Sequence, residues 1–75
     1  MAALTSLKKG QRALVKQVTG NGLIKQRLLK MGLVPGETVQ IEKIAPLGSP
    51  IDVLVKGYHL SLRKEEANCV EVEVI

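Results

Sequence analysis

Residues 70–74 read Val-Glu-Val-Glu-Val, the most regular alternation of apolar and charged residues in the chain. Successive side chains of a β-strand point to opposite faces of a sheet, so a period of two predicts a strand with one buried and one solvated face. We expect this strand to hold its end of the chain in a sheet.

The same period of two, more or less regular, occurs in four other segments that are mostly bounded by glycine or proline. They are residues 11–19, 37–42, 51–56 and 58–63. Residues 45–50 hold two prolines and a glycine, and they predict a loop between two of these strands. About five short strands with tight turns fit a small closed or nearly closed antiparallel barrel, because closure hides the sheet edges. The predicted fold class is mostly β.

One segment has the period of a helix. Within Leu23–Met31, the apolar residues Ile24, Leu28 and Met31 recur at i, i+4 and i+7, and so fall on one face. Asn21 or Gly22 can cap the start, and Gly32 suits a left-handed residue at the end. A helix this short is not stable alone in water, so we expect it to pack on the strands. Residues 64–68 favour a single further helical turn.

Length and composition indicate one globular domain over residues 1–75. The chain has 45% hydrophobic and 24% charged residues, too apolar for a disordered protein. Its apolar runs are too short to cross a membrane, and residues 1–7 lack the basic start of a secretion signal. The lone Cys69 cannot form an intramolecular disulfide. These features predict a cytoplasmic location.

Tyr58 is the only aromatic residue. The core must therefore be aliphatic. Grooves that grip proline-rich peptides and platforms that stack unpaired bases both depend on aromatic side chains. Their shortage argues against both kinds of binding.

Charge is distributed unevenly along the chain. Residues 1–36 carry seven Lys or Arg and no acid, a formal charge of +7, and the remainder carries four basic and seven acidic residues, or −3. This asymmetry suggests an acidic protein surface, a phosphate or a nucleic acid as partner. The alternative is that these charges only solvate outward faces.

No catalytic set is visible. The single histidine, His59, falls on the polar face of a predicted strand, and Cys69 lies two short elements away. Hydrolytic catalysis needs a nucleophile beside a base, or paired carboxylates with separated pKa values. Metal sites usually draw several His, Cys or carboxylates into one short segment, and there is neither a Cys pair nor a His pair. We predict a binding protein that is not an enzyme and holds no cofactor.

Two blocks carry a family resemblance. Residues 27–36 read RLLKMGLVPG, and residues 45–67 read APLGSPIDVLVKGYHLSLRKEEA. Together they resemble the FeoA family, small cytosolic components of bacterial ferrous iron uptake. The resemblance implies an SH3-like β-barrel with one short amphipathic helix. It also implies a role beside FeoB, a membrane transporter for ferrous iron whose cytoplasmic domain hydrolyses GTP.

The chain departs from the family pattern at Ser49, where the loop more often carries Asp between glycine and proline. FeoA domains also resemble the C-terminal module of iron-dependent repressors. Because no DNA-binding helix-turn-helix precedes the predicted barrel, a free-standing protein is the expectation.

The resemblance implies docking on the transporter, and membrane association only through it. No catalytic residues carry over. The nominated partner contacts are Lys25, Arg27, Leu29 and Lys30 on the helix, and Leu47 and Ser49 in the loop. Two alternatives stay open: an RNA-binding basic barrel, and a weak ferrous-ion module using His59, Cys69 or carboxylates. A weak homo-oligomer, the surface that docks, and activation or inhibition of the transporter are also open.

Overall fold

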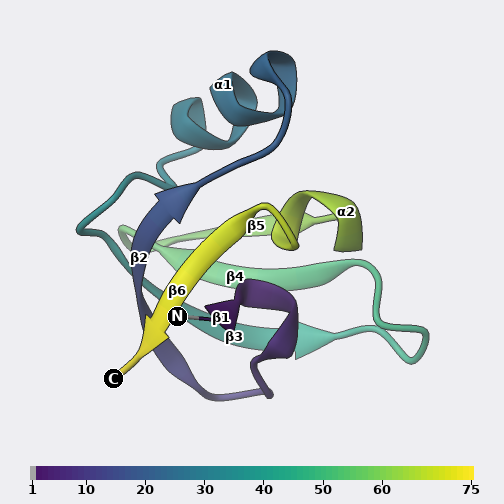
Figure 1. The fold of residues 1–75 in the computed structure, drawn as a ribbon. Coiled ribbons are helices and arrows are strands. Elements are labelled where there is room, and N and C mark those ends of the chain that lie inside the picture. The colour runs from purple at the N-terminus through teal and green to yellow at the C-terminus, as the bar shows by residue number, and fades with distance from the viewer. Residues whose placement is uncertain (1) are drawn as a thin grey trace.

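A computed structural model describes residues 2–75. Its centre is one six-stranded sheet with the strand order β1-β6-β2-β3-β4-β5, in which every neighbouring pair is antiparallel. The strands are β1 (Ala2–Ala3), β2 (Arg12–Val18), β3 (Thr38–Ile44), β4 (Ile51–Val55), β5 (Tyr58–Leu62) and β6 (Val70–Val74). The helical elements are the 3₁₀ helix η1 (Leu4–Ser6), α1 (Gly22–Lys30) and α2 (Lys64–Ala67). Figure 1 shows β2 and β6 crossing in front of β3 and β4, with α1 above the sheet.

The mostly β fold is confirmed, and the five predicted strands are present, but the prediction of about five strands was one short. The additional strand is β1, whose two alanines pair with Val72 and Glu71 of β6. Two identical small residues show no alternation, so the strand has no pattern that a sequence could reveal.

Strand β3 also runs two residues beyond the predicted end at Glu42. Its pairing with β4 shifts between Ile41 and Lys43, a bulge that breaks the alternation but lets Lys43 and Ile44 pair with Asp52 and Ile51. A second shift lies in β2 between Val15 and Gln17, against β6. Bulges increase the bend and twist of the strands that contain them.

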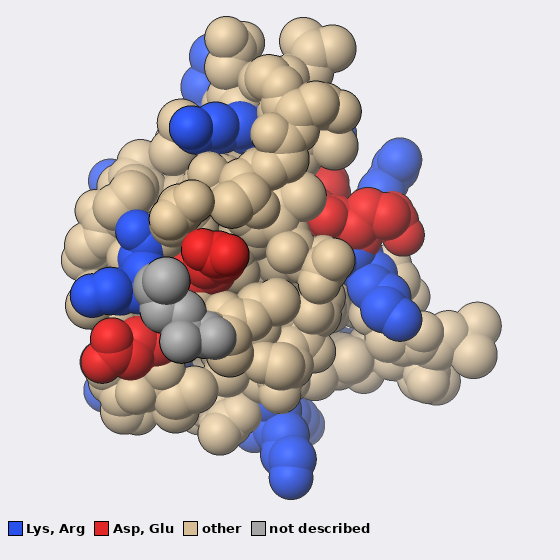
Figure 2. All heavy atoms as spheres, viewed as in Figure 1, with Lys and Arg blue, Asp and Glu red and all other residues tan. Residues whose placement is uncertain are grey.

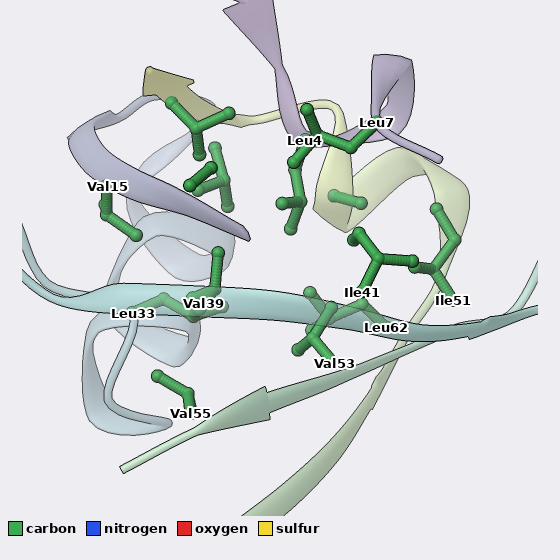
Figure 3. Packing of buried hydrophobic residues seen from close by; sticks show 14 of the residues in the cluster. Leu4, Leu7, Val15, Leu33, Val39, Ile41, Ile51, Val53, Val55 and Leu62 are labelled. Carbon is green, nitrogen blue, oxygen red and sulfur yellow. The ribbon is translucent and has the colours of Figure 1, made fainter. Parts of the chain in front are cut away.

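The core is aliphatic, as expected. Alternate residues of β2, β3, β4 and β6 point inward, and η1 and the segment after α1 add leucines (Figure 3). The buried hydrophobic residues are Leu4, Leu7, Ala13, Val15, Val18, Leu28, Leu33, Val39, Ile41, Ile51, Val53, Val55, Leu62, Ala67, Val70 and Val72. Burial of apolar surface at about 25 cal/mol per Å² is the main favourable term for a sheet of this kind.

Strands β4 and β5 form a tight hairpin. Its two turn residues, Lys56 and Gly57, both have positive φ, at 53° and 82°. Two successive left-handed residues match the twist of the flanking strands, and glycine adopts this conformation without strain. The hairpin places Tyr58 opposite Val55, at the beginning of β5.

Candidate docking surface

Helix α1 begins and ends where the sequence indicated, within one residue. The Asn21 side chain accepts a hydrogen bond of 3.0 Å from the backbone N–H of Ile24, so Asn21 is the N-cap. After the helix, Gly32 takes a φ of +97° and ends it. Leu28 is the one fully buried residue of α1, and it fixes the helix to the barrel.

A tyrosine holds the C-terminal end of α1 to the β4–β5 hairpin. The Tyr58 hydroxyl donates a 2.8 Å hydrogen bond to the carbonyl oxygen of Met31. A Cβ at Gly32 would lie 2.6 Å from that same hydroxyl oxygen. Glycine is therefore required at residue 32 for two reasons, its positive φ and the approach of Tyr58.

The four nominated helix residues differ in their surroundings. Lys25 and Lys30 are exposed, and neither forms a salt bridge within residues 2–75. Leu29 is half-buried and packs against the core. Arg27 is exposed, but its Nη1 lies 3.2 Å from Glu66 Oε2 on α2. Arg27 is thus engaged inside the molecule as well as facing solvent.

Glu66 is the feature that sequence reasoning missed. Its side chain is only 8% exposed, and Oε1 accepts a 2.9 Å hydrogen bond from the backbone N–H of Arg63 at the start of α2. A glutamate three residues after the N-cap is a known capping position, so the spacing from Arg63 to Glu66 was the available signal. A buried carboxylate needs hydrogen-bond donors and a compensating positive charge, and the guanidinium of Arg27 supplies that charge.

The nominated loop is joined to the same helix. Ser49 Oγ accepts a 3.1 Å hydrogen bond from the backbone N–H of Lys64, the first residue of α2. Leu47 is 92% exposed in this loop. We call α1, α2 and residues 45–50 together the candidate docking surface. Helix α2 connects its two nominated parts, through Arg27 on one side and Ser49 on the other.

The +7 and −3 halves of the chain do not form separate surfaces. Lys16 of β2 lies 3.7 Å from Glu73 of β6, and Arg27 of α1 lies 3.2 Å from Glu66 of α2. Antiparallel pairing of β2 with β6 brings basic residues of the first half beside acidic residues of the second. Figure 2 shows blue and red groups interspersed on this face. The face in Figure 2 shows no continuous basic stripe of the kind that binds phosphate backbones.

His59 and Cys69 lie in different places. His59 Nδ1 contacts Glu42 Oε1 on the outer face of the sheet, in an open depression that Asp52 also lines. The Cys69 thiol donates a 3.3 Å hydrogen bond to the carbonyl oxygen of Glu65 and packs beside Gly20. Residues 2–75 contain no group of three or more His, Cys, Asp or Glu side chains able to hold a metal ion.

None of the helices that the structure describes is both long enough and apolar enough to cross a membrane.

Comparison with known proteins gives a family. The model of the FeoA domain matches residues 2–74. A curated relative from Porphyromonas gingivalis, named as a fusion of Fe(2+) transport protein A with the Fe(2+) transporter FeoB, is 39% identical over 72 residues. That match covers 96% of this chain, and the chain spans 8% of the length of the fusion protein.

Solved structures agree in fold. A FeoA-like protein from Clostridium acetobutylicum is 34% identical, with a TM-score of 0.91 over 99% of this chain and 86% of its own. FeoA from Stenotrophomonas maltophilia, solved with zinc and described as a prokaryotic SH3 domain protein, is 32% identical, with a TM-score of 0.85. The match covers 97% of this chain and 91% of that one. The SH3-like expectation is therefore confirmed.

Proposed function

The chain belongs to the FeoA domain family, and from this premise we propose that it is a cytoplasmic accessory protein of bacterial ferrous iron uptake. It docks on the cytoplasmic part of a FeoB-type transporter. It acts by binding, without catalysing a reaction of its own.

The fusion protein of Porphyromonas gingivalis is the observation that carries the proposal. The name of that protein describes Fe(2+) transport protein A and the transporter FeoB fused in one polypeptide, and a region of it is 39% identical to this chain. Covalent linkage keeps two domains at a high effective concentration, which is useful where the domains act on each other. The present chain would reach the same partner by association.

The candidate docking surface supports the proposal physically. It presents the exposed side chains of Lys25, Lys30 and Leu47 on elements whose positions are fixed by α2. Arg27 has a double role here, because it holds α2 through Glu66 while part of its side chain remains open to a partner. Ser49 positions the loop against α2. Leu29, which packs on the core, sets the position of the helix.

Docking changes the activity of the transporter only if this chain binds one conformational state of the transporter more tightly than another. A ligand with equal affinity for two conformations leaves their populations unchanged, however tightly it binds. The chain must therefore bind one nucleotide state of the transporter more tightly than the other. That difference would alter GTP hydrolysis or gating.

A titration against the purified full-length transporter tests the proposal, with GDP and with a non-hydrolysable GTP analogue. We expect saturable binding whose dissociation constant differs between the two nucleotides. No binding in either state would overturn the proposal.

A second candidate function is weak binding of a divalent cation, favoured by the contact between His59 Nδ1 and Glu42 Oε1, which would supply two ligands. Imidazole and carboxylate groups are both ligands for first-row metals. Calorimetry with Fe²⁺ under anaerobic conditions tests it, because His59→Ala should remove any heat of binding. If the wild-type chain takes up no metal, this candidate fails.

A further inference from the structure

Helix α1 has an outward face that is distinct from the residues that fix it to the barrel. At 100° per residue, Leu23, Gln26 and Lys30 lie on one stripe, turned away from the side that carries Ile24 and Leu28. All three stripe residues are exposed. We call them the α1 stripe.

Leu23 is the conspicuous member of the stripe. It is 82% exposed, whereas the other apolar residues of α1 are buried or pack against the core. Leu23 lies away from the face of α1 that carries Leu28. Its side chain is therefore not part of the core, and packing in the core does not explain a large apolar residue there. An exposed apolar side chain on a rigid helix is suited to filling a socket on a partner.

The charge around Leu23 has one sign. Helix α1 contains three Lys or Arg and no acid, and its first turn lacks the acidic residues that usually stabilise a helix N-terminus. In Figure 2 the atoms over α1, at the top of the view, are tan and blue without red. Lys25 and Lys30 form no salt bridge within the described residues, so their charges are available to a partner.

We propose that the α1 stripe is the anchor of docking, with Leu23 filling an apolar socket in an acidic surface on the cytoplasmic part of the transporter. This inference rests on the proposed function and names the chemistry of the partner surface. An apolar centre with charged groups at its rim is the usual anatomy of a specific interface. The rim charges would steer association and make it depend on salt.

Binding of stripe variants to the transporter's cytoplasmic portion tests the inference. Leu23→Ala should weaken binding about tenfold, as loss of a central apolar anchor does. Lys30→Glu should weaken it by a similar factor and flatten its dependence on salt. Both residues are exposed, so circular dichroism and the urea midpoint of each variant should match the wild-type chain.

Matched control variants lie at the opposite end of the barrel from α1 (Figure 1). Ile75 is 64% exposed and serves as the apolar control, and Lys9, which is exposed in the turn before β2, serves as the charge control. Ile75→Ala and Lys9→Glu should bind within about twofold of the wild-type chain. If Leu23→Ala binds no more weakly than Ile75→Ala, the inference is wrong.

Amide NMR of the labelled full chain gives an independent readout. On addition of the transporter portion, shifts or line broadening should concentrate in residues 22–31. Concentration of the changes elsewhere contradicts the inference but leaves the proposed function standing, whereas no change and no binding contradicts both. If Leu23→Ala instead abolishes a dimer of this chain and leaves transporter binding intact, the stripe is a self-association surface and the inference fails.

Discussion

Arg27 Nη1 lies 3.2 Å from Glu66 Oε2, and this ion pair joins α1 to α2 across 38 intervening residues of chain. The two partners differ in exposure, because the Arg27 side chain is 61% exposed and that of Glu66 is 8% exposed. A residue nominated from sequence as a partner contact is therefore also one that holds α1 and α2 of the candidate docking surface together.

Arg27→Ala should lower the free energy of unfolding by about 1–2 kcal/mol, measured by urea denaturation. The substitution leaves the buried carboxylate of Glu66 without its cation, and solvent around Arg27 moderates the loss. Lys16→Ala is the matched control, because its partner Glu73 lies 3.7 Å away and both side chains are exposed. The control should cost about 0–0.5 kcal/mol. Equal losses for the two variants would show that the Arg27–Glu66 pair has no special role.

Gly32→Ala should destabilise the protein more than Gly36→Ala. Both glycines have a positive φ, at +97° and +94°, which costs an alanine about 1–2 kcal/mol. Only Gly32 adds a clash, since its Cβ would meet the Tyr58 hydroxyl, whereas a Cβ at Gly36 meets nothing within 4 Å.

Tyr58→Phe provides a check on that clash. Without the hydroxyl, the nearest remaining ring atom, Tyr58 Cζ, is 3.7 Å from the added Cβ, an ordinary contact. The penalty of Gly32→Ala should therefore shrink in the Tyr58→Phe background towards that of Gly36→Ala. Urea midpoints of the four variants measure this coupling, and strict additivity would contradict the account.

Ser49→Ala should cost about 0.5–1 kcal/mol, because Lys64 N–H loses its acceptor at the start of α2. Ser49→Asp should be as stable as the wild-type chain or more so, since a carboxylate accepts the same bond and suits a helix N-terminus. Ser61→Ala, an exposed serine of β5, should have little effect. If Ser49→Asp is as unstable as Ser49→Ala, the loop is not held by this hydrogen bond.

RNA binding should be absent in a filter assay at about 0.15 M salt. Basic residues of the first half of the chain lie beside acidic residues of the second half, as Lys16 beside Glu73 and Arg27 beside Glu66 show. Tight retention of RNA that falls steeply with salt would instead favour the nucleic-acid alternative.

Alternation and capping residues were sufficient to predict the barrel. In β6 the apolar residues Val70 and Val72 are buried as the alternation predicts, although Val74 is exposed. Asn21 and Gly32 mark the limits of α1. The strand β1 could not be predicted, because two alanines have no pattern and pair only through their backbone.

The contacts within the candidate docking surface could be predicted only in part, for a different reason. The sequence shows that Arg27 is basic, but its engagement with Glu66 depends on how α1 packs near α2. The helical period that placed Ile24, Leu28 and Met31 on the buried face of α1 also leaves Leu23 outside that face, so the exposure of Leu23 was open to prediction from the sequence. The charge asymmetry along the chain did not show where the charges lie on the surface, because strand pairing mixes residues that are distant in sequence.

Ferrous iron uptake into proteoliposomes that contain the purified transporter, with and without this chain, tests the central claim most directly. The account predicts that saturating chain changes the GTP-dependent uptake rate, with half of the change at the dissociation constant found by titration. An uptake rate that stays the same at saturating chain, under conditions where the transporter is active, would contradict it.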